Sequence, residues 1–570
     1  PDWFQRGINR VLGGFFGLFN RVFERGSEGY GRAVRRIVAI RWVVLGIFVI
    51  LLACTWGIFR IVPGGFIPAQ DKQYLIAIVQ LPDAASLDRT EKVVRQVSEL
   101  ATQTPGVAHA IGFTGLSVQG FVNLSNAAVI FFPLTAFEER TTKDLSAGAI
   151  VATLNKKFST IRDATIFAVP PPPVQGLGTT GGFKLYIQDR GAHGYDELAR
   201  VIGEVLTKAR QQHEINPYAT YTTYQNSVPQ LWADVDRVKA KRQAVPLSNV
   251  FDTLQAYLGS VYVNDFNRFG RTFRVYAQAE ARYRSKPEDI SDLKTRNLRG
   301  DMVPLGAVAD ISFQAGPDRV SHYNVYLAAD INGGAGPGIS SGQATAAMER
   351  VLNETLPNGF GYEWTDLTFQ QKSAGSTALF VFPICVMLVF LILSAQYESW
   401  GLPLAVILIV PMCLLFAMLG VFLKGSDNNV LTQIGFIVLV GLACKNAILI
   451  VEFARDGVER GLSPIDAAIE ACRLRLRPIL MTSFAFIMGV VPLVTATGAG
   501  SEMRQAIGIA VFSGMLGVTL FGLFLTPVFF VTIEKAAQKR PGEDPGSAGA
   551  PTPASASGPA LTTAEEPPRA

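Results

Sequence analysis

The chain has 570 residues, of which 49% are hydrophobic and only 17% are charged, and its formal net charge is +5. This composition is typical of a membrane protein with a large water-exposed part. The basic residues concentrate beside apolar segments, as membrane topology requires, so the positive charge does not indicate a nucleic-acid-binding surface. The five cysteines all lie in or beside apolar segments, which excludes a disulfide framework or a cysteine-based metal site between residues 63 and 377.

Residues 1–37 alternate bulky apolar side chains with arginines. This pattern predicts a basic amphipathic helix in the headgroup region of an anionic membrane leaflet. A solvated linker is the alternative, but it explains the arginines and not the phenylalanines. The first residue is Pro1 rather than Met and no signal peptide follows, which indicates part of a longer chain. Residues 38–62 then hold the first predicted spanning helix, at about Trp42 to Phe59.

The region from 63 to 371 contains a predicted internal repeat. Its first unit, residues 63–178, has strands at 74–81, 107–113, 127–134 and 164–169 and helices at 86–102 and 145–158, the βαββαβ order of a ferredoxin-like unit. The second unit comprises residues 179–228 and 316–371, with strands at 183–189, 219–224, 324–331 and 362–368 and helices at 195–212 and 343–355. An insertion at 229–315 has its own helix at 247–257 and strands at 274–278 and 308–313. Two like units, one carrying an inserted subdomain, predict an α+β fold.

Residues 372–536 contain five further apolar segments, at about 378–395, 402–423, 429–453, 478–497 and 506–533. With the first helix they make about six spans, so both ends of the chain lie on one side of the membrane. Arginines and lysines gather on that side, which the positive-inside rule assigns to the cytoplasm. The region between the first and second spans is then exported, and in a bacterium it is periplasmic. Residues 537–570 are rich in Pro, Ala, Ser and Gly and predict a disordered cytoplasmic tail.

Lys445 lies near the middle of the segment 429–453, where an ammonium group costs about 3 kcal/mol or more. About eight helical residues, or about 12 Å, separate it from Phe453, which argues against snorkelling to the interface. A lysine at this depth needs a carboxylate, yet no other apolar segment has an Asp or Glu in its middle. Such a lysine between carboxylates is a proton switch, because neutralising one carboxylate weakens the attraction and lets the helices repack.

Three other polar residues accompany this lysine. Asn446 supplies both a donor and an acceptor, and the hydroxyl of Thr482 is able to reach the same site. A threonine within a helix more often bonds a carbonyl of its own helix. Arg475 lies at a cytoplasmic helix end, where its ordinary role is that of a topology anchor.

Several segments resemble the resistance-nodulation-division (RND) transporters, most closely the hydrophobe/amphiphile multidrug efflux pumps of Gram-negative inner membranes. In the spans these are GLACKNAILIVEFARDG (441–457), RLRPILMTSFAFIMGVVPLV (475–494) and SGMLGVTLFGLFLTPVFFV (513–531). The segments VPGGFIPAQDK (62–72), YVNDFNRFGRTFRVYAQAEARYR (262–284) and QYESWGLPLAVILIVPM (396–412) agree as well. The resemblance covers about residues 20 to 536 and corresponds to the C-terminal half of such a pump.

The resemblance implies spanning helices seven to twelve, two porter subdomains and, at 229–315, a docking or funnel subdomain. It implies a secondary active transporter, not an enzyme, that is driven by the proton gradient without a cofactor or metal. Lys445, Thr482 and Arg475, with Asn446 beside them, match the family's proton relay, whose paired aspartates belong to the N-terminal half. The implied partners are that half, amphiphilic drugs, membrane lipids, two further copies in a homotrimer, a periplasmic adaptor and an outer-membrane channel.

The resemblance also assigns residues that contact substrate. The segment Gly112 to Phe121 matches a glycine-rich switch loop, in which Gly112, Gly115 and Gly120 permit movement and Phe113, Leu116 and Phe121 offer apolar surface. Phe131 matches a distal-pocket phenylalanine, and proximal-pocket positions are matched by Ile78, Phe167, Val169 and Pro171. A plain surface loop and ordinary core packing are the alternatives. Two differences from the family's pattern concern substrate preference. Gly115 stands where the switch loop of the family has a second phenylalanine, and an arginine of the proximal pocket is absent near Tyr221 to Gln225.

Three other functions fit parts of the sequence. The metal-efflux branch of the superfamily uses methionine ligands, but the exported region has only Met302 and Met348, far apart in sequence. A protein- or lipid-export or sterol-sensing relative shares the repeats but not the combination of Lys445 with the switch loop. An enzyme or receptor with an exported domain is disfavoured, since the four histidines form no metal pattern and no nucleophile or phosphate-loop motif is present.

Overall fold

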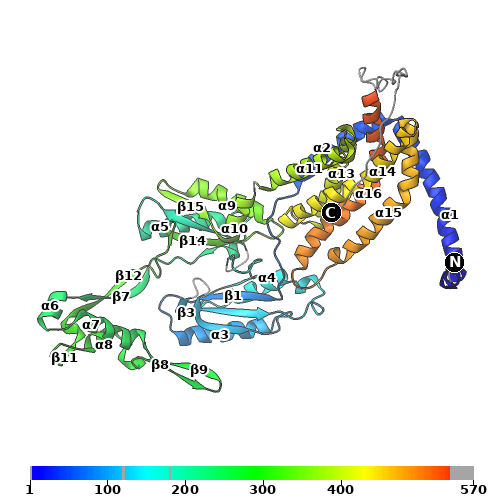
Figure 1. Cartoon of the computed structure of the whole chain (residues 1–570). Helices are drawn as coiled ribbons and strands as arrows, with labels where there is room; N and C mark the ends of the chain where they lie inside the picture. The colour runs from blue at the N-terminus through cyan, green and yellow to red at the C-terminus, as the bar shows by residue number, and fades with distance from the viewer. Residues whose placement is uncertain (1–2, 118–121, 179–181, 376, 539–570) are drawn as a thin grey trace, which may run out of the picture.

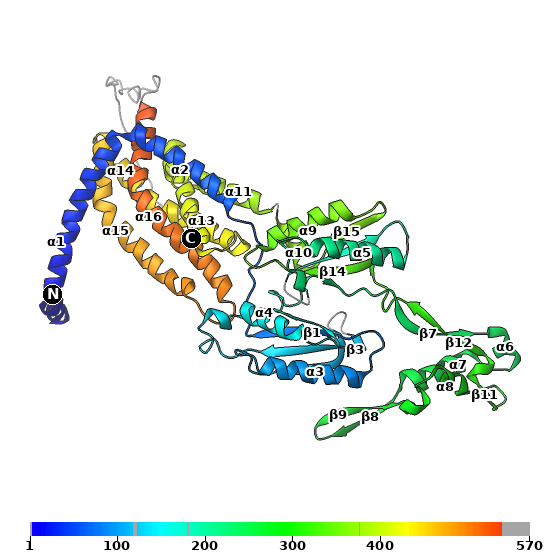
Figure 2. The same cartoon turned by 180° about the vertical axis from the view of Figure 1, so that it is seen from behind.

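The computed structural model describes residues 3–117, 122–178, 182–375 and 377–538 (Figure 1). A bundle of long helices forms one end of the molecule, and two units of strands and helices lie next to each other beside it. The inserted segment projects farthest from the bundle, and a hairpin of β8 (Val261–Arg268) and β9 (Arg271–Ala277) extends from it as a separate arm (Figure 2). The chain is therefore organised as a membrane part, two sheet units and an extension.

Six helical segments in the described part of the chain are long and apolar enough to cross a membrane, in agreement with the predicted number. They are α2 (Arg41–Ile61), α11 (Thr377–Tyr397), α12 (Gly401–Ile407) with α13 (Val410–Lys424), α14 (Val430–Glu459), α15 (Pro464–Val494) and α16 (Ser501–Gln538). The third segment is broken at Leu408–Ile409, because Pro411 has no N–H and its ring crowds the preceding turn. Helix α15 begins well before the predicted span, since its first turns are polar and lie outside the apolar segment.

The amphipathic helix predicted at the N-terminus is α1 (Trp3–Ala39). Its C-terminal part packs against the bundle, where Val34 and Val38 are fully buried. The Tyr30 hydroxyl donates a 2.6 Å hydrogen bond to the Leu523 carbonyl of α16. Pro527 lies four residues further along α16 and has no N–H for that carbonyl, so Tyr30 supplies the donor that the helix lacks. This contact ties α1 to the membrane part.

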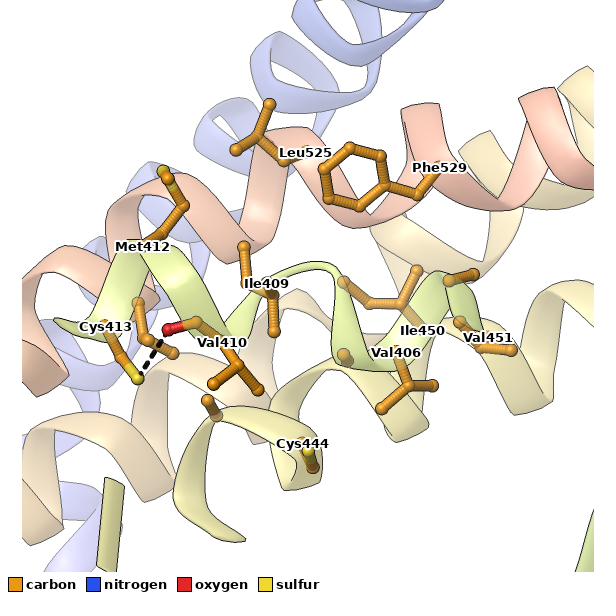
Figure 3. Close-up of a cluster of buried hydrophobic side chains, with 14 of the residues drawn as sticks. Val406, Ile409, Val410, Met412, Cys413, Cys444, Ile450, Val451, Leu525 and Phe529 are labelled. Atoms are coloured by element: carbon orange, nitrogen blue, oxygen red, sulfur yellow. Dashed lines mark hydrogen bonds between the residues drawn. The ribbon is translucent and has the colours of Figure 1, made fainter. Parts of the chain in front are cut away.

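The core of the bundle is a close-packed apolar cluster (Figure 3). Side chains from α12 and α13 meet α14 and α16 there, among them Val406, Ile409, Val410, Met412, Cys413, Cys444, Ile450, Val451, Leu525 and Phe529. Helix α16 approaches its neighbours closely through glycines: a Cβ on Gly514 would collide with Leu439, and one on Gly517 with Phe416. Small residues at helix contacts are the usual means of close packing in membranes.

The first sheet unit contains β1 (Tyr74–Gln80), α3 (Leu87–Thr102), β2 (Ile111–Ser117), β3 (Val122–Pro133), α4 (Ala147–Phe158) and β4 (Thr165–Val169). Its strands are antiparallel in the order β2-β3-β1-β4, and the two helices share one core with one face of the sheet. The predicted strand at 107–113 is displaced: Val107 makes only an isolated bridge to Leu134, and β2 starts at Ile111. Residues 112–117 are consequently strand, so only part of the predicted switch loop is free to be a loop.

The second sheet unit repeats this arrangement. It contains β5 (Phe183–Asp189), α5 (Tyr195–Arg210), β6 (Tyr221–Thr222), β13 (His322–Tyr323), β14 (Tyr326–Gly333), α9 (Ser341–Thr355), β15 (Phe360–Trp364) and α10 (Asp366–Ala374). The path β6-β14-β5-β15 corresponds to β2-β3-β1-β4, and β13 adds a further pair to β14. Helices α5 and α9 pack on this sheet with Leu185, Ile187 and Ile331 in a separate core.

The inserted segment leaves and re-enters the second unit through a two-stranded ribbon of β7 (Val228–Val235) and β12 (Ala309–Gly316). Beyond it a small separate core forms around Val250, Leu305 and Val308. The remaining elements are α6 (Arg237–Arg242), α7 (Leu247–Leu254), β8 (Val261–Arg268), β9 (Arg271–Ala277), α8 (Pro287–Asp292), β10 (Lys294–Arg296) and β11 (Met302–Pro304). Every residue of the β8–β9 hairpin is exposed.

Two phenylalanines on opposite faces of the first sheet provide a test of this packing. Phe132 is fully buried under α3 and α4, whereas Phe113 is 47% exposed. We expect Phe132→Ala to lower the local opening free energy of this unit by about 3–5 kcal/mol, because it removes a large core side chain and leaves a cavity. Phe113→Ala should change it by less than about 1.5 kcal/mol. Amide hydrogen exchange of β1 and β3 in the whole chain measures both, and equal effects would contradict the assignment of the two faces.

Candidate functional site

Helices α14 and α15 place the polar membrane residues opposite one another. Each helix begins with a side-chain cap: Asn429 accepts from the Thr432 N–H, and Ser463 accepts from the Asp466 N–H. The helices run antiparallel along the bundle (Figures 1 and 2). Lys445 lies near the middle of α14 and Thr482 near the middle of α15, so both fall at a similar depth.

A cavity of about 280 Å³ lies where these residues meet. Its polar lining residues are Lys445, Asn446, Thr482 and Ser483, and its apolar ones are Leu442, Ala485, Phe486 and, from α16, Met515. The structure thus brings together three of the four residues proposed from the sequence for the proton relay. Four polar side chains around one cavity in an otherwise apolar bundle are expected to mark an ion or proton pathway.

The hydrogen bonds in this cavity differ from the sequence-based expectation in one respect. Asn446 Nδ2 donates to Ser483 Oγ at 3.0 Å, and both side chains are buried. Thr482 Oγ1 instead donates to the Ile479 carbonyl of its own helix at 3.2 Å. Ser483 was not identified from the sequence, although its position beside Thr482, opposite an asparagine, was a signal available there. The interhelical bond is therefore made by Asn446 and Ser483.

Lys445 itself is exposed on the bundle surface. It forms no hydrogen bond or ion pair with any of the side chains that the structure describes between residues 20 and 538. Ile434 and Val438 lie on the same face of α14 at helical spacing, and each is 45% exposed. Gly441 continues this face towards the lysine and is also exposed. Lys445 thus ends an apolar helix face that no described part of the chain covers.

Arg475 lies outside the cavity lining. Its guanidinium carbon is 3.3 Å from the centroid of the Phe453 ring, a cation–π contact between α15 and α14. Its Nε is buried without a hydrogen-bond partner among the described residues. The structure therefore places Arg475 nearer the C-terminal end of α14 and does not bring it into contact with Lys445.

The second group of proposed residues lies on the first sheet. The strand register forms two rows across it, Phe113–Val129–Ile78–Phe167 and Ile111–Phe131–Ile76–Val169. Side chains alternate between the two faces of a strand, and the helices cover the face of Leu75, Ala77 and Val79. Both rows therefore lie on the face without helices, where Phe113 and Phe131 meet edge to face at 5.8 Å. Five of the proposed residues share this helix-free face: Ile78, Phe113, Phe131, Phe167 and Val169.

The accessibility of these five residues differs. Val169 is buried, so core packing accounts for it, and Phe167 stacks on Tyr221 of the second unit at 5.4 Å. Pro171 is also buried, and it starts the turn whose next two carbonyls, of Pro172 and Pro173, accept hydrogen bonds from Lys72 Nζ. Phe113, Phe131 and Ile78 keep accessible surface.

The glycine-rich segment is structured up to Ser117. Gly112 lies against α3, where a Cβ would come within 2.7 Å of Val94 Cγ1. Gly115 has a φ of 84° at a bulge in β2, a conformation that favours glycine, and Leu116 then pairs with Asn123. Gly120 and Phe121 lie outside the described residues.

No group of three or more His, Cys, Asp or Glu side chains that could hold a metal ion occurs among the described residues.

Comparison with known proteins gives a consistent result. The sequence model of the AcrB/AcrD/AcrF family matches residues 5–534. The multidrug/solvent efflux pump membrane transporter MepB of Pseudomonas putida is 39% identical over 535 residues, which are 93% of this chain and 50% of MepB. The multidrug export protein AcrF of Escherichia coli strain K12 is 37% identical over 526 residues, 92% of this chain and 50% of AcrF. The chain spans about half the length of the curated relatives that it matches.

A double-mutant cycle tests the interhelical bond in the cavity. We expect Ser483→Ala and Asn446→Ala to show a coupling energy of about 0.6–1.7 kcal/mol, the range for hydrogen bonds between membrane helices. Thr482→Ala with Asn446→Ala is the matched control and should show none, because Thr482 bonds its own helix. Unfolding in mixed micelles measures all variants, and a larger coupling for Thr482 than for Ser483 would contradict the assigned bond.

Proposed function

The chain belongs to the AcrB/AcrD/AcrF family of RND efflux transporters, and on that basis we propose that it acts as the C-terminal half of a proton-driven multidrug efflux pump. Its predicted family and its predicted inner-membrane location are confirmed by the family match and the six membrane-capable helices. The proposed activity is the exchange of protons for amphiphilic or hydrophobic compounds, which pass from the periplasm and the inner membrane towards an outer-membrane channel. No cofactor is needed, since the proton gradient supplies the energy.

Lys445 carries the proposal. Its ammonium group lies at mid-depth beside a cavity that also contains Asn446 and Ser483. An ionisable group at this depth is costly and is kept mainly where charge moves. When a carboxylate near Lys445 takes up a proton, the attraction between them weakens and the helices are able to shift. Thr482 shares the cavity, and Arg475 is proposed to act at the cytoplasmic end of the same helix pair.

The proposed source of the carboxylates is the other half of the pump. Relatives are about twice as long as this chain, and the helix face that ends at Lys445 is apolar and uncovered. A second helix bundle packed on that face would bury Ile434 and Val438 and bring its acidic side chains to the lysine. Proton transport by this chain therefore requires that half.

Substrate is proposed to contact the helix-free face of the first sheet, within one of two ferredoxin-like porter subdomains. Phe113, Phe131 and Ile78 offer a contiguous apolar surface there, and amphiphilic ligands bind such surfaces through apolar contact. Leu116 and the segment with Gly112, Gly115, Gly120 and Phe121 adjoin it in sequence and form the proposed switch. Phe167, Val169 and Pro171 are proposed to line the side facing the second subdomain.

The remaining partners are proposed from the family. The pump is a homotrimer that works with a periplasmic adaptor and an outer-membrane channel, and the inserted subdomain at 229–315 with its exposed hairpin serves docking. Helix α1, whose outer side carries Arg25, Arg32 and Arg36, is proposed to contact lipid headgroups at the cytoplasmic surface.

The relay is tested with Lys445→Ala in the complete pump. We expect assembly to be preserved and gradient-dependent drug efflux to be lost, because the carboxylates lose the cation that responds to their protonation. Lys445→Arg should also be strongly impaired, since the planar guanidinium holds a carboxylate through two hydrogen bonds and does not reproduce the compact ammonium group. Lys424→Ala, at the exposed end of α13, is the control and should retain efflux. Drug extrusion from energised cells is the measurement, and full gradient-dependent efflux by Lys445→Ala would remove the assignment.

The substrate surface is tested by binding to the purified complete pump. We expect Phe131→Ala to weaken the binding of an aromatic amphiphile by about 10- to 150-fold, because burying a phenylalanine against a ligand contributes about 1.5–3 kcal/mol and each 1.4 kcal/mol is about tenfold. Phe313→Ala removes an equally large exposed side chain from the inserted segment and should leave the affinity unchanged. Fluorescence polarisation of a dye substrate gives both constants. Equal affinities in the two variants would argue against the sheet face as the binding surface.

A further inference from the structure

Residues 62–73 join α2 to β1, and we call them the membrane–sheet linker. The linker is bound at two separate places to two different membrane helices and two different sheet units. Only Ile67, Pro68 and Ala69 lie between the two sets of contacts. Because a proline stiffens this short bridge, the two places are held at a restricted separation.

The first half of the linker is bound to α14 and to the second unit. The Asn428 N–H donates to the Pro63 carbonyl at 2.9 Å, and the Val430 N–H donates to the Phe66 carbonyl at 3.1 Å. On its other side, Ser340 Oγ donates to the Gly64 carbonyl at 2.8 Å, at the start of α9. Gly342 has no space for a side chain, because a Cβ there would collide with the Gly64 carbonyl. The start of the lysine helix is thus joined to α9.

The second half of the linker is bound to α16 and to the first unit. The Asp71 N–H donates to Glu502 Oε1 at 3.2 Å, and Gln70 Nε2 lies 2.8 Å from Met503 Sδ. The Asp71 carboxylate accepts hydrogen bonds from both terminal nitrogens of Arg140, at 2.8 and 3.3 Å, and the Arg140 side chain is only 2% exposed. Lys72 Nζ donates to the carbonyls of Pro172 and Pro173.

Both helices held by the linker also line the membrane cavity, α14 through Lys445 and Asn446 and α16 through Met515. Because the bridge keeps the two places close together, a change in the angle between α14 and α16 turns the second unit relative to the first. These units meet where Phe167 stacks on Tyr221, at the edge of the helix-free face. Charged and hydrogen-bonded contacts of this kind transmit displacement, because a buried pair such as Asp71–Arg140 is costly to separate.

We propose that the membrane–sheet linker couples the proton cavity to the gap between the two units, with Glu502 and Asp71 as positioning residues. This inference rests on the proposed function. In this proposal each end of the linker moves as one body with the membrane helix that it contacts, whereas the contact between the two sheet units changes. Such coupling requires that the two units have two discrete arrangements, and that a change in the membrane part favours one of them.

The first test replaces Glu502 in the complete pump reconstituted into liposomes. Glu502→Ala removes the acceptor for the Asp71 N–H and should lower drug-stimulated proton flux at least tenfold, with the drug dissociation constant changed less than twofold. Glu502→Gln keeps a side-chain oxygen and should retain most of the flux. Unchanged flux in Glu502→Ala, or equal loss of binding and flux, would overturn the coupling role. Absence of drug-stimulated flux in the unmodified pump would instead contradict the proposed function.

The second test locks each contact with a short, reducible thiol cross-linker, after replacement of the five native cysteines. Cross-linked Gln70→Cys/Met503→Cys should continue to transport, because that contact moves as one body. Cross-linked Asp83→Cys/Asp318→Cys, which joins the first unit to the second at two neighbouring carboxylates outside the substrate surface, should stop transport until a reductant is added, because the contact between the units must change. Transport blocked by the first lock, or unaffected by the second, would contradict the proposal.

Discussion

A cation in the hydrocarbon part of a membrane is the constraint on which the rest of this structure depends. The ammonium group of Lys445 costs about 3 kcal/mol or more at that depth unless an anion or polar groups accompany it. The chain supplies a cavity with Asn446, Thr482 and Ser483 but leaves the lysine on an uncovered apolar face. The partner bundle proposed above would offset this cost by packing on that face, and the half-length match to known pumps accords with the proposal.

The sheet units use their apolar residues in two different ways. Period-two alternation sends Leu75, Ala77 and Val79 under the helices and leaves Ile76 and Ile78 on the other face. One face consequently holds the unit together, while the other carries aromatic side chains that no helix covers. Because the two faces are built from neighbouring residues of the same strands, the helix-free face is positioned as rigidly as the core itself.

The membrane part and the sheets are connected by hydrogen bonds and ion pairs at a few residues, whereas the cores of the bundle and of the sheet units are apolar. Arg140 is nearly inaccessible and is fully engaged by Asp71 and nearby carbonyls. Directional contacts of this sort define the relative position of two elements more narrowly than apolar packing does, since their hydrogen bonds weaken steeply with distance and angle. Gly342 then permits the two backbones to approach closely, since a Cβ there would collide with the Gly64 carbonyl, and Gly65 leaves room for the Asp427 side chain.

The sequence alone predicted the number of spans, the order of strands and helices in both sheet units and the unusual position of Lys445, because each depends on hydrophobic periodicity along a continuous segment. It placed β2 wrongly and missed Ser483, since strand ends and interhelical hydrogen bonds depend on partners distant in the chain. It placed Arg475 at a helix end and not at the depth of Lys445, and in the fold that arginine stacks on Phe453, outside the cavity. Two features emerged only from the folded chain: which residues share the helix-free face, and how residues 62–73 are held. The first depends on strand register, and the second on the approach of α14, α16 and α9. Both are set by contacts between segments that are far apart in the sequence.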